Sequence, residues 1–152
     1  MTAEFSLVLD SQCALGESPV WWAEAGVLVF IDISGHRLHR FDPQSERHEL
    51  NAVGEDIGCI APARGGGYVA GMRSGVWLLG ASGEQRRKLA DNAENPATNR
   101  FNDGRVDPRG RYLAGTVDEP AGVTFLLAFP FPGPPLGGPE HLAGQMFEAS
   151  IF

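Results

Sequence analysis

Short apolar runs, each introduced by a glycine turn, recur along the first three quarters of the chain. The clearest copies are residues 26–32, 67–72 and 110–116. Their matching positions Leu28, Tyr68 and Tyr112 are separated by 40 and then 44 residues. This spacing falls in the range of roughly 40–50 residues that is typical of four-stranded propeller blades. The pattern therefore predicts an all-β protein with a β-propeller architecture.

The other strands of each unit are predicted from apolar runs bounded by turn residues. A strand is expected before each copy, at residues 18–22, 57–61 and 102–106. Further strands are expected at residues 37–41, 46–50, 76–79 and 85–89. Glycine and proline interrupt every window with helical periodicity before residue 120, so no helix is expected there. The chain thus contains about two and a half predicted blades.

The end of the chain departs from this repeat. Residues 123–129 fit one more strand, but they run directly into the proline-rich residues 130–135, which no sheet interior tolerates. Six of the 11 prolines lie between Pro120 and Pro139. We therefore divide the chain into a partial propeller at residues 1–122 and a divergent Pro/Gly-rich tail at residues 123–152.

Composition narrows the classes of partner. The chain has 152 residues, 43% of them hydrophobic, and a formal net charge of −7. A globular protein of this charge repels nucleic acid and anionic membranes, so neither is expected as a partner. Residues 1–10 lack the features of a signal peptide, and no apolar run reaches the ~20 residues of a membrane helix. We therefore expect a cytoplasmic protein that handles neutral molecules or cations.

The cysteines and histidines give no metal-site pattern in the sequence. Cys13 and Cys59 form no CxxC spacing, so both are expected to be buried free thiols. The four histidines are expected to be surface or structural residues; they are His36, His39, His48 and His141.

Candidate chemistry follows from the repeat. In a propeller the first strand of every blade lines the central axis, so equivalent strand ends converge on one opening. Glu17 precedes the first such strand, and Asn102 and Asp103 begin the third. We therefore predict that Glu17 and Asn102 face one axial pocket. Taken singly, Glu17 also fits a solvated turn, Asn102 an Asx turn and Arg100 a surface charge.

Three segments together resemble a known family. Residues 15–21, 65–70 and 99–116 are similar in order and separation to the SMP-30/gluconolactonase/luciferin-regenerating-enzyme family, and the similarity extends over roughly residues 5–119. The resemblance implies a six-bladed β-propeller with one divalent metal ion (Ca, Zn, Mn or Mg) in the axial channel. It also implies hydrolysis of sugar lactones, with a sugar lactone as the small-molecule partner.

Family roles transfer to four positions. By resemblance, Glu17 is a metal ligand and Arg100 and Asn102 bind substrate. An acidic substrate contact follows the strand at residues 112–116, and Glu119 is assigned to it, with Asp118 as the neighbouring alternative. The family's proton-accepting Asp and its remaining metal ligands belong to later blades, which have no counterpart after residue 122. No catalytic residue is therefore assigned within this chain, which resembles the first half of a propeller.

The best interpretation is a divalent-metal-dependent sugar lactonase of the gluconolactonase type, incomplete in this chain. Carboxylate and amide oxygens suit hard cations, but Ca²⁺ usually takes 6–8 oxygens, and Glu17 alone supplies few of them. Two alternatives stay open: a non-enzymatic calcium-binding protein of the regucalcin kind, and an inactive fragment. An exposed blade edge also predicts self-association.

Overall fold

The computed structural model describes residues 5–129, which form eleven strands and contain no helix long and apolar enough to span a membrane. The first sheet contains β1 (Gly16–Trp22), β2 (Val27–Asp32), β3 (Arg37–Asp42) and β4 (Arg47–Ala52). The second contains β5 (Ile57–Pro62), β6 (Tyr68–Met72), β7 (Gly75–Leu79) and β8 (Gln85–Asp91). The third contains β9 (Asn99–Val106), β10 (Tyr112–Asp118) and β11 (Val123–Phe129). Paired strands are antiparallel and follow chain order throughout.

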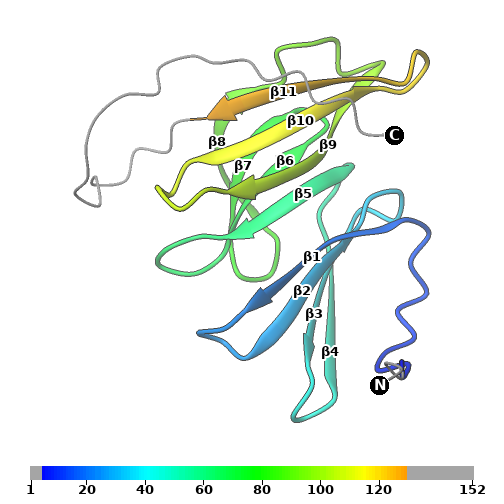
Figure 1. Ribbon diagram of the computed structural model, residues 1–152, viewed down its shortest axis with the longest axis vertical. Coiled ribbons are helices and arrows are strands. Elements are labelled where there is room, and N and C mark those ends of the chain that lie inside the picture. Colours follow the sequence, from blue (N-terminus) through cyan, green and yellow to red (C-terminus); the bar gives the residue numbers. More distant parts are fainter. Residues whose placement is uncertain (1–4, 130–152) are drawn as a thin grey trace.

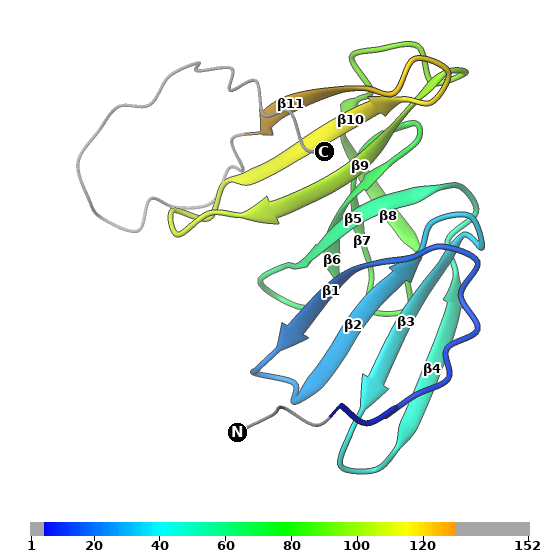
Figure 2. The same ribbon diagram turned by 45° about the vertical axis from the view of Figure 1, so that its right-hand side comes forward.

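The three sheets are arranged like neighbouring blades of a propeller. The first strands β1, β5 and β9 lie side by side and run in the same direction, with β5 in the middle (Figure 1 and Figure 2). The later strands of each sheet extend away from this row. The predicted all-β propeller architecture is confirmed: the described residues hold two four-stranded blades and one three-stranded sheet. Residues 130–152, most of the predicted tail, lie outside the described residues, so the division at residue 122 stays a prediction.

Each first strand carries an irregularity near its beginning. In β1 the register with β2 shifts between Glu17 and Val20, and Ser18 there has a positive φ of 52°. In β5 the shift leaves Gly58 unpaired, and in β9 it leaves Asn102 unpaired against β10. A β-bulge redirects the side chains around it and is common beside functional sites. The inner row of strands is therefore disrupted at corresponding places in all three sheets.

The inner strands of the middle sheet are buried on both faces. Strands β5 and β6 are almost wholly buried, which explains why they appear in the sequence as continuous apolar runs. One apolar cluster joins the first and second sheets; its largest members include Ile31, Leu38, Ile57, Tyr68 and Leu79. A second cluster joins the second and third sheets and consists of Cys59, Ala61, Val69, Val76, Phe101, Tyr112 and Ala114. Burial of apolar side chains between the sheets is thus the main force that fixes their relative positions.

Two close contacts lock β5 against the third sheet. A Cβ added at Gly58 would collide with the backbone carbonyl oxygen of Phe101, so only glycine permits this approach. The buried Tyr112 hydroxyl lies 3.1 Å from the Cys59 carbonyl oxygen, to which it can donate, and accepts a hydrogen bond from the Gly71 amide at 3.1 Å. Cys59 is a buried free thiol, as predicted, and burial raises its pKa to about 12.

Candidate functional site

Arg100 joins the residues predicted to contact substrate. Its Nε donates to Oε1 of Glu119 at 3.1 Å, and its Nη1 donates to Oδ1 of Asn102 and to the Phe101 carbonyl oxygen, both at 3.0 Å. The Arg100 side chain is only 13% exposed. Three of the four predicted site residues therefore form one hydrogen-bonded group, which we call the Arg100 cluster. Their role toward a substrate stays a prediction.

The β9–β10 hairpin explains why residues 19 positions apart meet. Asn99 pairs with Asp118, so Arg100 at the start of β9 lies beside Glu119, which directly follows β10. The Glu119 amide donates to the Thr98 carbonyl oxygen at 2.9 Å and fixes the end of the hairpin. The bulge at Asn102 leaves that side chain exposed next to Arg100. Local strand pairing thus assembles the cluster.

Two side chains of the Arg100 cluster keep hydrogen-bond donors that are unpaired among the described residues. Arginine carries five N–H groups in a rigid fork, and the three on Nε and Nη1 are used. Within residues 5–129, Nη2 of Arg100 has no hydrogen-bond partner. Since Oδ1 of Asn102 accepts from Arg100, the amide group Nδ2 of Asn102 is left to donate elsewhere. The cluster is therefore suited to bind oxygen atoms such as sugar hydroxyls.

An ion-pair network missed by the sequence analysis extends from this cluster across all three sheets. Arg73, which directly follows β6, donates to Oε2 of Glu119 at 2.8 Å and to Oδ2 of Asp56 at 2.8 Å. The other oxygen of Asp56 lies 2.7 Å from Nε2 of His36, in the turn between β2 and β3. Neither Arg73 nor Asp56 belongs to a sequence motif. The only feature of the sequence that could have indicated them is their position at the ends of neighbouring blade strands, Asp56 directly before β5 and Arg73 directly after β6.

The network keeps its carboxylates ionised. The hydrogen bond from Arg73 lowers the pKa of Glu119, and the Arg100 charge adds to this effect. Burial raises the pKa of Asp56, but the hydrogen bonds and charges of Arg73 and His36 outweigh it, so the pKa lies below its ordinary value. An ionised carboxylate with a lowered pKa accepts hydrogen bonds well but is a weak base. These groups therefore suit binding and positioning rather than proton abstraction.

Glu17 lies apart from these contacts. It is exposed at the start of β1, and its side-chain carboxylate has no hydrogen-bond or ion-pair partner among residues 5–129. It begins the strand that runs alongside β5 and in the same direction as β9 (Figure 2). The convergence of Glu17 and Asn102 on one pocket stays a prediction. In the described part of the chain, Glu17 belongs to no group of three metal-ligating side chains, so these residues do not complete an oxygen-ligand metal site around it.

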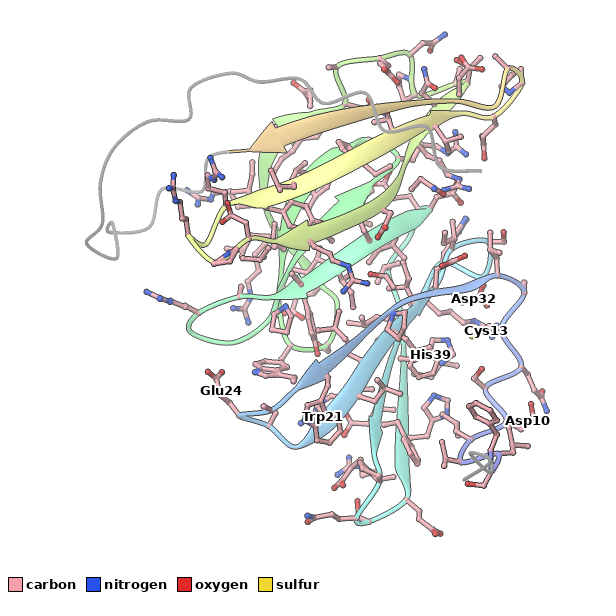
Figure 3. The ribbon with its side chains drawn as sticks, in the orientation of Figure 1. Asp10, Cys13, Trp21, Glu24, Asp32 and His39 are labelled. Atoms are coloured by element: carbon pink, nitrogen blue, oxygen red, sulfur yellow. The ribbon has the colours of Figure 1, made fainter. Side chains whose placement is uncertain are left out.

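A different set of side chains forms a group able to hold a metal ion. Cys13, Asp32 and His39 each place one ligand atom within 4.8 Å of the others. They come from the segment before β1, the end of β2 and the middle of β3 (Figure 3). Cys13 is half-buried, which differs from the predicted buried thiol, because the segment around it is largely exposed. Sequence reasoning missed the group because its members share no characteristic spacing.

Comparisons with known proteins identify the family. Residues 15–123 match the model of the SMP-30/Gluconolactonase/LRE-like region. A 6-deoxy-6-sulfogluconolactonase of Pseudomonas putida is 40% identical over 120 residues, covering 79% of this chain and 41% of that protein. Regucalcin of Xenopus laevis is 39% identical over 112 residues, covering 74% of this chain and 38% of that protein. The chain thus spans about two fifths of the length of these relatives.

Solved structures agree with the fold. The structure of a calcium-binding protein, regucalcin, from Agrobacterium tumefaciens matches with a TM-score of 0.71 and 22% identity, covering 79% of this chain and 42% of that one. A luciferin-regenerating enzyme matches with a TM-score of 0.68 and 25% identity, covering 76% of this chain and 42% of that one. The family match at residues 15–123 covers most of the strands described above, and the structural matches cover a similar share of the chain. The chain therefore belongs to the SMP-30/gluconolactonase/LRE-like family.

Proposed function

We propose that this chain forms the substrate-binding part of a sugar lactonase of the gluconolactonase type. The observation that carries the proposal is the Arg100 cluster, in which Arg100, Asn102 and Glu119 are joined by hydrogen bonds at the start of an inner strand. The 40% identity to a sulfogluconolactonase and the likeness to a gluconolactonase of Xanthomonas campestris (TM-score 0.61, 20% identity, 78% of this chain and 45% of that one) support it.

Binding of a lactone needs donors for its hydroxyl and ring oxygens. The unpaired Nη2 of Arg100 and the amide Nδ2 of Asn102 are such donors, and Glu119 holds the guanidinium in place through Nε. Donors that are fixed before the ligand arrives lose little entropy on binding, which makes each contact more effective. In this proposal Arg100 and Asn102 contact the sugar, and Glu119 and Arg73 position Arg100.

A divalent ion, when bound in members of this kind, would polarise the lactone carbonyl. Glu17 is the oxygen ligand that this chain would contribute, in line with its exposed and unpaired carboxylate. One carboxylate fills a small part of the coordination sphere of Ca²⁺ or Mg²⁺, and the described residues add no other ligand to it. The proposal for Arg100 and Asn102 therefore rests on hydrogen bonding alone.

The test is binding of gluconolactone to the full chain, measured by calorimetric titration, with folding shown by circular dichroism. Arg100→Lys keeps the charge but loses the fork that holds both Glu119 and Asn102, so the Kd should rise at least tenfold. Arg105→Lys, further along the same strand in an exposed position, should leave the Kd unchanged. Equal Kd values in the two variants would contradict the role of Arg100. Absence of saturable binding by the unaltered, folded chain would contradict the proposal itself.

Self-association through the open blade edges is proposed alongside this activity. β4 and β8 have one hydrogen-bonded neighbour each in the described sheets, so each presents an edge. Sedimentation at several concentrations measures this directly, and a mass equal to one chain at all concentrations would contradict it.

A further inference from the structure

The side-chain group Cys13, Asp32 and His39 brings sulfur, oxygen and nitrogen donors together where the N-terminal segment meets the interior strands β2 and β3 of the first sheet. Sγ of Cys13 lies 3.6 Å from Nε2 of His39, and one ligand atom of each residue lies within 4.8 Å of the others. Asp32 and His39 are 1% and 0% exposed, while Cys13 is half-buried. Figure 3 shows Cys13 on the N-terminal segment turned toward the sheet that carries the other two.

His39 has the orientation that a metal ligand requires. Its Nδ1 lies 3.0 Å from Nε2 of His48, and its ring stacks on Phe30 with centroids 4.5 Å apart. If Nε2 of His39 binds a cation, Nδ1 carries the proton and donates it in a hydrogen bond to His48. This second contact fixes the ring and its tautomer, as is usual for metal-binding histidines.

The Asp32 carboxylate is also fixed in place, by three hydrogen bonds from backbone amides. Its Oδ1 accepts hydrogen bonds from the amides of Leu15 and Gly35 at 2.9 and 3.0 Å, and its Oδ2 accepts one from the Ala14 amide at 3.0 Å. A carboxylate oxygen has two lone pairs, so Oδ2 keeps one for a further partner.

The separation of the sulfur and nitrogen ligand atoms matches the size of a tetrahedral zinc site. Zinc binds thiolate sulfur at about 2.3 Å and imidazole nitrogen at about 2.0–2.1 Å, so two such ligands at a tetrahedral angle are about 3.5 Å apart. The observed separation of Sγ and Nε2 is 3.6 Å. We propose that Cys13, Asp32 and His39 bind one borderline-soft divalent cation of the Zn²⁺ class, with water in the fourth position.

This site is distinct in chemistry from the oxygen-ligand site proposed around Glu17. Thiolate and imidazole favour Zn²⁺ over Ca²⁺ or Mg²⁺, which prefer oxygen ligands only. Its position suggests a structural effect: the cation would tie the segment before β1 to β2 and β3. A cation that binds only the folded chain raises its stability by mass action.

Cobalt(II) titration of the reduced full chain is the direct test, because thiolate-bound Co²⁺ has an intense charge-transfer absorption. We expect one equivalent to saturate this band, Zn²⁺ to abolish it by competition and excess Ca²⁺ to leave it unchanged. Cys13→Ala should remove the band and lower affinity at least 100-fold. Glu17→Gln should change neither, which separates this site from the proposed lactonase site. Co²⁺ binding without the charge-transfer band, or the same band in Cys13→Ala, would overturn the proposal.

A second measurement needs no variant. Iodoacetamide should alkylate Cys13 in the native chain, and one equivalent of Zn²⁺ should slow this labelling at least tenfold, as read by mass spectrometry of the peptides. Cys59 is fully buried and serves as the internal control, unlabelled in both samples until denaturant is added. Labelling of Cys13 at one rate with and without Zn²⁺ would exclude the site.

The His48→Gln variant tests the contact behind His39. It should keep the cobalt band but weaken affinity for Co²⁺ roughly 10–100-fold, because it removes only the hydrogen bond between His48 and His39.

Discussion

Arg100 and Glu119 form an ion pair across the β9–β10 hairpin, with Nε of Arg100 3.1 Å from Oε1 of Glu119. The other oxygen of Glu119 binds Arg73 from the second sheet, and Arg73 in turn binds Asp56. A carboxylate shared between two guanidinium groups from neighbouring blades couples the position of Arg100 to the packing of the blades. The proposed lactone-binding residues are thus part of the same network that joins the sheets at this end.

Asn102→Asp should weaken lactone binding without weakening the fold. The new carboxylate can still accept from Nη1 of Arg100, but it has no amide to donate to a sugar oxygen. Loss of one such hydrogen bond, about 1–3 kcal/mol, corresponds to roughly a 10–100-fold rise in Kd. Calorimetric titration with gluconolactone measures this, and Asn51→Asp on the outer strand β4 is the control. An unchanged Kd in Asn102→Asp would show that the amide is not a substrate contact.

The Arg73 network should make stability depend on pH in the acid range. Glu119 and Asp56 have folded-state pKa values below their ordinary values of 4.5 and 3.8. The two carboxylates therefore contribute fully to the free energy of unfolding above about pH 5. This contribution is lost as the pH falls through their lower folded-state pKa values. We expect the free energy of unfolding in urea to fall below pH 4.5 and to fall less steeply in Arg73→Leu.

Arg111→Leu is the control for this experiment, since it removes an arginine that binds Asp107 at the β9–β10 turn. The lowered pKa of Asp107 gives that pair its own acid dependence, while the Arg73 network stays intact. If Arg73→Leu and the unaltered chain lose stability with the same slope, the network does not hold the two pKa values down.

The repeated strands could be predicted because each depends on local signals: apolar runs, glycine turns and a spacing near 40 residues. The start of β9 at Asn99 instead of residue 102 escaped prediction because Asn99 and Arg100 are polar and join the strand only through pairing with β10. The Arg73 network and the Cys13 group could not be predicted. Their members contact one another across sheets or across 26 sequence positions. The burial of a polar residue such as His39 also cannot be recognised from the periodicity of hydrophobic positions in the sequence.

Gly58→Ala should be unusually damaging for such a small change. The added Cβ would collide with the Phe101 carbonyl oxygen, and because the nearest atoms are all backbone atoms of Phe101 and Asn102, they cannot move aside easily. We expect a loss of about 2–3 kcal/mol in the free energy of unfolding. Gly26→Ala is the comparison: its φ is 64° and nothing lies within 4 Å, so only backbone strain of about 1 kcal/mol is expected. Equal losses in the two variants would mean that β5 and β9 do not approach closely.

Two buried tyrosines offer a matched test of hydrogen bonding between the second and third sheets. The Tyr112 hydroxyl lies within hydrogen-bond distance of the Cys59 carbonyl oxygen and the Gly71 amide, whereas the Tyr68 hydroxyl has no partner within residues 5–129. Tyr112→Phe should lower the free energy of unfolding by about 1–3 kcal/mol, because it leaves buried polar groups unpaired.

Tyr68→Phe should be neutral or stabilising, because it removes a hydroxyl that is buried without a partner. Both residues are 0% exposed, so the two substitutions remove the same atom from buried sites that differ in hydrogen bonding. Urea unfolding of the two variants therefore isolates the contribution of the Tyr112 hydroxyl. A loss in Tyr68→Phe as large as that in Tyr112→Phe would contradict the assignment, since burial rather than hydrogen bonding would then explain both.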